Sequence, residues 1–296
     1  MIAIPIVVVV LVLGAILGLG WDASGKAIHP GCGTYAWTIA DYPKLAAEEV
    51  SVESQTGATL SGRFFPGRTR ATVILLHGYG GNQDEMLPAA DELHEAGFSV
   101  FTYDQRGCGR SSGEVTFGGH EQDDLLSVVD HLAARPDVDG DRIGAFGFSM
   151  GGSTALLAAA REPRIKAVAA DSAWSDVRRW LRPSVGAVFT RPRDRFNALS
   201  LKLAELRTGI DLDDLRPVDV VGRLSPRPLL LIHGTADDVV LPSESERNYE
   251  AANEPKKLVL VPGAGHGDTI APGEPSTHTD VREFFQRALV PTKAAA

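Results

Sequence analysis

The stretch RIGAFGFSMGGSTALLAAA (residues 142–160) joins an apolar run to an Ala-rich run through a serine that lies between glycines. The apolar run predicts a buried strand, the Ala-rich run predicts a helix, and Ser149 falls at the turn between them. Gly147 and Gly151 stand two positions on either side, which leaves room for a sharp turn that raises the serine hydroxyl. The stretch therefore predicts a nucleophilic serine, and a Gly-rich turn with a capping serine is the alternative.

The rest of the chain alternates in the same way between short apolar runs and helical patterns. Continuous apolar runs of this kind are typical of parallel strands covered on both faces, and they read "ATVILLHG", "FSVFTYD", "IKAVAADS", "PLLLIHG" and "KLVLVPG". Helices are predicted over residues 83–96, 120–133, 150–161, 244–252 and 277–289. The alternation predicts an α/β fold with a doubly wound, mostly parallel sheet. Upstream, alternating apolar residues on both sides of Gln55-Thr56-Gly57 predict an N-terminal antiparallel hairpin.

The alternation lapses after the run "IKAVAADS", and we expect a small helical cap insertion there, at about residues 173–216. The segment is amphipathic in patches and carries Trp174, Trp180 and Phe189. These aromatic side chains are candidates for an apolar substrate pocket, and packing of the cap onto the sheet is an equally weighted alternative. The main domain is expected to cover residues 46–290.

The first 21 residues contain no charged side chain and end in Trp21. In a helix, 21 residues span about 30 Å, the thickness of a bilayer's hydrocarbon core. The segment therefore predicts one uncleaved N-terminal transmembrane anchor, with a cleaved signal segment and secretion as the alternative. The side of the membrane is left open, because Lys26 is the only basic residue nearby. Residues 22–45 are predicted to be a linker.

Composition excludes several classes of partner. The net charge is −9 and no run of Lys or Arg forms a basic patch, so nucleic acid is not an expected partner. The two cysteines, Cys32 and Cys108, lie in unrelated contexts without zinc-ligand spacing. No metal site is predicted, and the sequence does not predict a Cys32–Cys108 disulfide, although it leaves that pairing open.

A nucleophilic serine needs a base and an acid that orients the base. His266 lies in the Gly-rich loop "VPGAGHGD" just past the last predicted strand, although a solvated loop histidine is the alternative. Asp237 follows the strand predicted at residues 229–232, and Asp238 and Asp171 are competing carboxylates. The order Ser149, Asp237, His266 is the order expected for this architecture.

An oxyanion hole is predicted from the loop "LLHGYGGN" after the first parallel strand. The backbone N–H of Tyr79 in that loop and the N–H of Met150, directly after the serine, are the assigned donors. His77 is expected to have a structural role in the loop.

Together, the segments "LLHGYGGN", "YDQRGCGRSSGE", "GFSMGG", "IHGTADDVV" and "VPGAGH" resemble the α/β-hydrolase superfamily, in the order in which they occur. The likeness extends over about residues 48–289 and is closest to the esterase/serine-aminopeptidase-like branch with a small cap. It implies that Asp237, in His-Gly-x-x-Asp, is the acid of the triad, and that Asp104 and Arg106 are scaffold residues. It implies no metal or organic cofactor.

The predicted function is that of a serine hydrolase that cleaves carboxylic esters through an acyl-enzyme, acting on a small-molecule ester or acyl substrate. A peptidase or a thioesterase with the same triad is an alternative within enzymes. An inactive membrane-tethered binding protein is the alternative outside them, because the fold alone does not determine function. The sequence leaves the oligomeric state and the natural substrate open.

Overall fold

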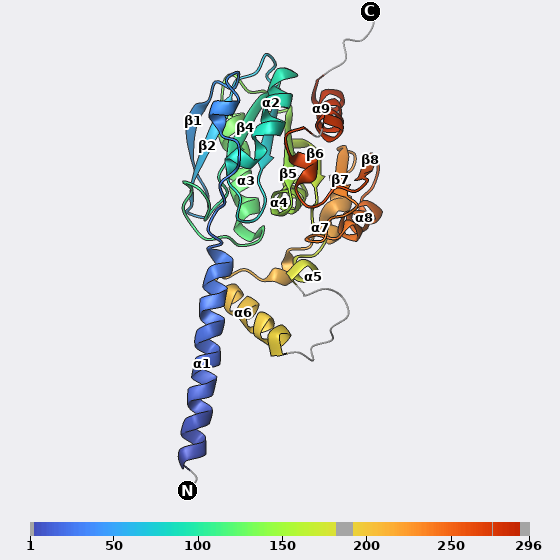
Figure 1. Cartoon of the computed structure of the whole chain (residues 1–296). Coiled ribbons are helices and arrows are strands. Elements are labelled where there is room, and N and C mark those ends of the chain that lie inside the picture. Colours follow the sequence, from blue (N-terminus) through green and yellow to red (C-terminus); the bar gives the residue numbers. More distant parts are fainter. Residues whose placement is uncertain (1–2, 182–191, 274, 291–296) are drawn as a thin grey trace, which may run out of the picture.

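The computed structural model describes the backbone of residues 3–181, 192–273 and 275–290, and the side chains of residues 14–181, 198–273 and 277–290. Its described part is built on an eight-stranded sheet with the order β1-β2-β4-β3-β5-β6-β7-β8 (Figure 1). The strands are β1 (Glu48–Glu53), β2 (Thr59–Phe65), β3 (Thr72–Leu76), β4 (Ser99–Tyr103), β5 (Ile143–Phe148), β6 (Ile165–Asp171), β7 (Leu229–Gly234) and β8 (Lys256–Val261). The β1–β2 and β2–β4 pairs are antiparallel and the others are parallel. The predicted hairpin and doubly wound sheet are confirmed.

Helices cover both faces of the sheet, because alternate side chains of each central strand point to opposite sides. On β3, Val73 and Leu75 are fully buried in one apolar cluster, whereas Ile74 and Leu76 are fully buried in the other. The first cluster includes α2 (Leu87–Glu95) and α9 (Pro275–Leu289), and the second includes α3 (Gly119–Ala133), α4 (Met150–Ala159) and α8 (Pro242–Ala251). The predicted helices therefore occur with small shifts at their ends.

The chain between β6 and β7 is helical, as the predicted cap requires. It contains α5 (Val177–Leu181), α6 (Pro192–Thr208) and the short α7 (Pro217–Val220). Phe189, one of the predicted pocket residues, lies outside the described residues.

The first helix, α1 (Ala3–Ile28), extends away from the main body, and α6 lies beside it (Figure 1). The linker was predicted to begin at residue 22, but the helix continues seven residues past Trp21. Asp22 and Lys26 form an ion pair of 2.7 Å across one turn of this extension. The guanidinium of Arg207 on α6 lies 4.6 Å from the ring centre of Trp21. Among the described residues, no helix is both long and apolar enough to cross a membrane. The side chains of residues 1–13, in the segment predicted to be an anchor, lie outside the described residues.

The cysteines correct an expectation, because Cys32 and Cys108 form a disulfide. They are 76 positions apart in the sequence, but their Cα atoms are 5.4 Å apart. The chain after α1 folds back over the loop that follows β4, and this juxtaposition depends on tertiary structure. Spacing along the sequence therefore carried no signal for the pair.

Candidate active site

Ser149 occupies a strained turn between β5 and α4. Its φ of 52° and ψ of −116° lie in a region of backbone conformation that residues other than glycine rarely adopt. The flanking glycines are sterically required: a Cβ on Gly147 would lie 2.2 Å from the backbone of Gly151, and a Cβ on Gly151 would lie 2.3 Å from the carbonyl oxygen of Leu76. Strained turns of this kind cluster at functional sites, and this one lies at the carboxyl edge of the sheet.

The structure brings His266 and Asp237 to the same edge. The Nε2 atom of His266 is 3.2 Å from the Oγ of Ser149, and its Nδ1 is 2.7 Å from a carboxylate oxygen of Asp237. Ser149 is 4% exposed and Asp237 is 3% exposed, whereas the His266 side chain is 17% exposed. A base that lies between a hydroxyl and a buried carboxylate can accept the hydroxyl proton and remain oriented while charged.

Asp237 is held ionised by the groups around it. Burial alone would raise the pKa of Asp237, but the hydrogen bonds from His233 and His266 lower it overall. The backbone N–H groups of Val239 and Val240 also donate to its other oxygen, each at 2.9 Å. The loop after β7 therefore presents a carboxylate whose negative charge is favoured at neutral pH.

The two competing carboxylates are placed differently. Asp238 is exposed, next to the buried Asp237. Asp171, at the end of β6, is fully buried and accepts a hydrogen bond from the hydroxyl of Ser172 at 2.9 Å. Burial raises the pKa of Asp171 to about 6. In the described part of the chain, the acid that contacts His266 is Asp237.

His233 is a residue near the site that the sequence reasoning missed. It is fully buried on β7, and its Nε2 lies 2.8 Å from the carbonyl oxygen of Val240 and 3.3 Å from Asp237. Because a carbonyl oxygen can only accept, Nε2 carries a proton. The Asp237 oxygen that lies 3.3 Å from this nitrogen is the one that His266 contacts. The His-Gly-x-x-Asp spacing was the available signal, since it places the histidine at the end of the same strand.

The two predicted oxyanion donors lie at the ends of neighbouring strands. Met150 is the first residue of α4, so its N–H has no acceptor within the helix. Tyr79 follows β3, and no hydrogen bond from its N–H to another described residue is present. Buried His77 steadies this loop: its Nε2 accepts from the N–H of Gln105 at 2.8 Å, so its Nδ1–H donates to the carbonyl oxygen of Gly78. Burial lowers the pKa of His77, which favours this neutral form.

Comparison with known proteins agrees with this geometry. A sequence model of the prolyl oligopeptidase family matches residues 89–291. The chain belongs to the prolyl oligopeptidase family. Among curated proteins, it is 32% identical over 262 residues to the uncharacterized protein YfhR of Escherichia coli K12, covering 83% of each chain. It is 31% identical over 271 residues to the uncharacterized protein Rv2307c of Mycobacterium tuberculosis H37Rv, covering 90% of this chain and 89% of that one.

Solved structures place this member of the family in the predicted α/β-hydrolase superfamily. The esterase PF2001 of Pyrococcus furiosus superimposes with a TM-score of 0.71 at 26% identity, over 89% of this chain and 99% of that one. The α/β hydrolase GrgF of Penicillium sp. sh18 superimposes with a TM-score of 0.67 at 23% identity, over 83% of this chain and 100% of that one, which supports the fold alone. The family match and the solved structures agree that the chain is a hydrolase with this fold.

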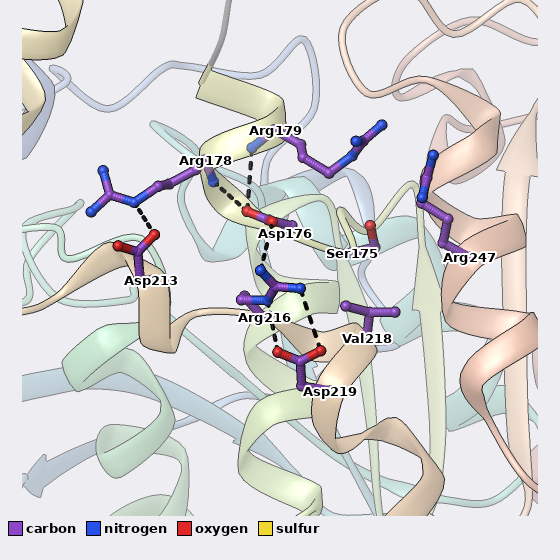
Figure 2. Close-up of a pocket in the computed structure, with 9 residues that line it drawn as sticks. All are labelled: Ser175, Asp176, Arg178, Arg179, Asp213, Arg216, Val218, Asp219 and Arg247. Atoms are coloured by element: carbon purple, nitrogen blue, oxygen red, sulfur yellow. Dashed lines mark hydrogen bonds and ion pairs between the residues drawn. The ribbon is translucent and has the colours of Figure 1, made fainter.

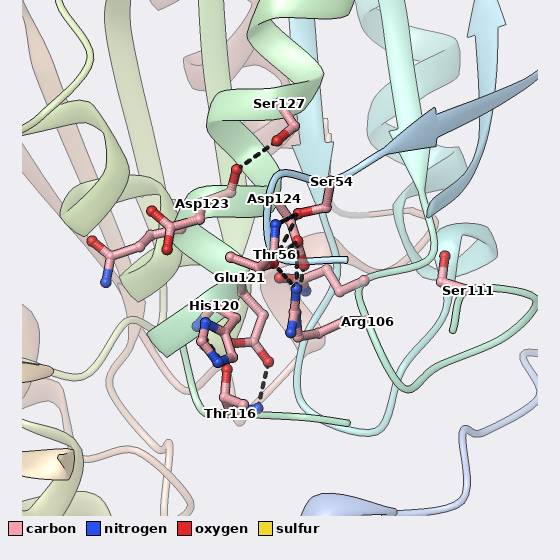
Figure 3. A network of polar contacts seen from close by, with 12 residues as sticks. Ser54, Thr56, Arg106, Ser111, Thr116, His120, Glu121, Asp123, Asp124 and Ser127 are labelled. Carbon is pink, nitrogen blue, oxygen red and sulfur yellow. Dashed lines mark hydrogen bonds and ion pairs between the residues drawn. The ribbon is translucent and has the colours of Figure 1, made fainter. Parts of the chain in front are cut away.

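A buried polar network supports the loop after β4 in this family member (Figure 3). Arg106 donates to both carboxylate oxygens of Asp124 at 2.7 Å, and its guanidinium also contacts the hydroxyl of Thr56. Glu121, fully buried, accepts hydrogen bonds from the N–H and the hydroxyl of Thr116. The network ties β1–β2, the loop and α3 together, in agreement with the scaffold role expected of Arg106.

Asp104 supports the same loop from another side. Its carboxylate accepts hydrogen bonds from the N–H groups of Gln83 and Arg110, each at 2.9 Å. These bonds connect the loop after β4 to the loop that carries Tyr79. Asp104 therefore acts as the scaffold residue that the resemblance implied.

Two of the predicted pocket aromatics, Trp174 and Trp180, lie near Tyr79. Trp174 is fully buried and stacks on the half-buried Trp180 with ring centres 4.7 Å apart. The Trp180 ring contacts the Tyr79 ring edge-on at 5.9 Å, and Phe117 stacks on the other side of Tyr79 at 5.6 Å. The cap is thus joined to the loop that carries Tyr79 through aromatic contacts.

A cavity of about 450 Å³ opens beside the cap (Figure 2), and Ser149, Asp237 and His266 are not among the residues that line it. Arg216 lies between Asp219 at 2.7 Å and Asp176 at 3.4 Å, and Arg178 pairs with Asp213. Its lining consists of Ser175, Asp176, Arg178, Arg179, Asp213, Arg216, Val218, Asp219 and Arg247. Most of its charges are therefore compensated by neighbours within the cap.

Proposed function

We propose that this chain is a serine hydrolase that cleaves small carboxylic esters through an acyl-enzyme. The observation that carries the proposal is the position of the His266 imidazole, 3.2 Å from the Ser149 hydroxyl and 2.7 Å from the Asp237 carboxylate. The strained backbone of Ser149 supports it, because strain of this kind is retained where the surrounding structure maintains it for function.

In the proposed first half-reaction, His266 Nε2 takes the proton from Ser149 Oγ as the oxygen attacks the ester carbonyl. The negative charge that develops on the carbonyl oxygen is stabilised by the N–H groups of Tyr79 and Met150. When the intermediate collapses, the bond to the alcohol breaks and the departing alkoxide takes the proton from His266. Asp237 stabilises the imidazolium between these steps.

In the second half-reaction, water replaces the alcohol. His266 accepts a proton from water as its oxygen attacks the acyl carbon, and then returns the proton to Ser149 Oγ as the acid leaves. The enzyme ends in its starting state, so the cycle needs no cofactor. The half-buried Trp180 ring, which stacks on Trp174, is proposed to contact the acyl or alcohol group of the substrate.

The ester assignment is supported by the likeness to the P. furiosus esterase at 26% identity over nearly all of that chain. A peptidase is the second candidate, and the match to the prolyl oligopeptidase family favours it. The same triad serves both reactions, so the leaving group must be tested directly. A panel of matched esters, thioesters and aminoacyl amides with graded acyl lengths separates them, and we expect the highest kcat/KM for the short esters.

The nucleophile is tested by labelling with a fluorophosphonate probe. The wild-type chain should be labelled at Ser149, and Ser149→Ala should abolish labelling while leaving the circular dichroism spectrum unchanged. Ser153→Ala is a matched control, because this buried serine lies one helical turn further on and donates to the carbonyl oxygen of Trp174. A folded wild type that resists the probe would contradict the proposal and favour a binding protein.

A further inference from the structure

Residues Ala27–Trp37, here called the strap, lie across the loop that carries Tyr79. The hydroxyl of Tyr79 donates to the carbonyl oxygen of Ala27 at 2.8 Å. The N–H of Gly33 donates to the carbonyl oxygen of Gly80 at 2.7 Å, and the side-chain amide of Asn82 donates to the carbonyl oxygen of Gly33 at 2.7 Å. The strap therefore contacts this loop at the proposed donor residue Tyr79 and at Gly80 and Asn82, which follow it.

Two aromatic residues of the strap add to this contact, one of them through the buried carboxylate of Glu85. The hydroxyl of Tyr35 donates to one oxygen of Glu85 at 2.6 Å, and the other oxygen accepts from the N–H of Gly78 at 2.6 Å. Glu85 is 8% exposed. Trp37 donates from its indole N–H to the carbonyl oxygen of Asp84 at 2.8 Å. Through Glu85, the strap thus holds the peptide group directly before the proposed oxyanion donor.

A covalent bond closes the strap onto the body of the protein. Cys32 in the strap pairs with Cys108 in the loop after β4, and the carbonyl oxygen of Ile28 accepts from the N–H of Val115 at 3.0 Å. Cys108 is 1% exposed, whereas Cys32 is half-buried. An attacking thiolate therefore has better access to the sulfur of Cys32.

We propose that the strap is a positioning element of the oxyanion hole, which the Cys32–Cys108 disulfide locks and a dithiol reductant releases. This inference rests on the proposed serine-hydrolase function. In the release, a thiolate of the reductant attacks Cys32 Sγ, the protein S–S bond breaks, and Cys108 leaves as a thiolate that takes up a proton. The second thiolate of the reductant then displaces Cys32, so the protein gains two electrons and the reductant becomes a disulfide.

The expected consequence is a loss of rate with little loss of substrate binding. Removing one donor from an oxyanion hole lowers kcat by about 10²–10³-fold. A loosened loop still samples the productive position part of the time, so the expected loss is smaller, about tenfold. KM should change by less than about twofold, because the hydrogen bonds to the carbonyl oxygen strengthen in the transition state.

The experiment compares the oxidised full-length chain with the same chain after treatment with dithiothreitol, with free thiols counted in each. On a p-nitrophenyl ester, reduction should lower kcat about tenfold, and reoxidation should restore it. The double variant Cys32→Ser/Cys108→Ser should show the lower kcat without reductant and should not respond to it. Thr34→Ala, at an exposed strap position with no described side-chain contact, should behave as the wild type.

A second readout separates positioning from simple destabilisation. A thionoester places sulfur, a weak hydrogen-bond acceptor, in the oxyanion hole, so its turnover should fall less than that of the ester. Tyr35→Phe keeps the disulfide but removes the bond to Glu85, and it should reproduce part of the ester-specific loss even if the double variant fails to fold.

The proposal would be overturned by full reduction that leaves kcat within twofold, or by equal losses on the ester and the thionoester. If the oxidised chain neither reacts with fluorophosphonate nor cleaves esters, the serine-hydrolase proposal itself fails and this inference fails with it. If Ser149 is labelled in the oxidised chain and reduction has no effect on kcat, the proposal about the strap is rejected and the serine-hydrolase proposal stands.

Discussion

The ends of β6 and β7 each carry a buried aspartate, and only one of them contacts His266. Asp237 accepts two backbone N–H groups and two imidazole groups, which lower its pKa overall despite its burial. Asp171 accepts the Ser172 hydroxyl, and burial raises its pKa to about 6. Two residues of the same type at adjacent strand ends thus have pKa values shifted in opposite directions, because more donors face the Asp237 carboxylate than face the Asp171 carboxylate.

The largest expected effect comes from exchanging the acid for its amide at each end. Asp237→Asn should lower kcat by about 10⁴-fold, because an amide cannot stabilise the His266 imidazolium and permits the wrong tautomer. Asp171→Asn should leave kcat within about threefold. Steady-state kinetics on the same ester measures both variants. A large loss with Asp171→Asn alone would show that the acid had been assigned to the wrong strand end.

A smaller effect is expected on the free energy of unfolding, which Asp171→Asn should raise. Its folded-state pKa of about 6 lies above the unfolded value of about 4, so the folded state favours the protonated form. The penalty of the ionised carboxylate is full above about pH 6 and is relieved as the pH falls toward 4. Asp171→Asn should therefore raise the free energy of unfolding by about 2–3 kcal/mol at pH 8 and by little at pH 4.

Urea unfolding of Asp171→Asn and wild type at the two pH values measures this difference. Asp171→Ala is a poor substitute, since it would add a cavity term to the comparison. A gain that is equal at pH 4 and pH 8 would contradict the assignment, because it would show that ionisation of Asp171 plays no part.

A further prediction concerns His233, the second imidazole near the Asp237 carboxylate. His233→Ala removes one donor to the carboxylate, and hydrogen bonds to charged groups contribute about 1.5–3 kcal/mol. We expect kcat to fall about tenfold at nearly constant KM, because the acid would be less well oriented. Ser245→Ala is the matched control, since it removes only the partner of the other ring nitrogen. Equal losses in both variants would indicate a general packing effect of this buried site.

The smallest effect on kcat/KM is expected for Asp238, the neighbour of Asp237 in the sequence. Asp238 is exposed, so Asp238→Asn should change kcat/KM by less than about twofold at moderate ionic strength. The same ester assay measures it. A tenfold loss would mean that the loop after β7 can present either carboxylate to His266, and the contrast between the two strand ends would no longer explain the choice of acid.

Much of this site could be predicted because strand–helix alternation and turn chemistry are local properties. Ser149 between glycines, His266 in a Gly-rich loop and Asp237 after an apolar run each follow a strand, and parallel strands end at one edge. The cysteine pair could not be predicted in this way, because nothing near Cys32 or Cys108 indicates that the chain folds back between them. The role of Glu85 was missed for the same reason, because it depends on the positions of Tyr35 and Gly78 in space. His233 was missed although the His-Gly-x-x-Asp spacing offered a local signal.

The sequence by itself determined the α/β fold, the order of the three candidate catalytic residues and their common edge, since apolar periodicity and glycine placement act over a few residues. Only the tertiary structure decided which aspartate contacts His266, how the strap lies on the oxyanion loop and that the two cysteines pair. These outcomes depend on burial and on hydrogen bonds between residues that are distant in the chain, and such contacts exist only after the sheet has formed.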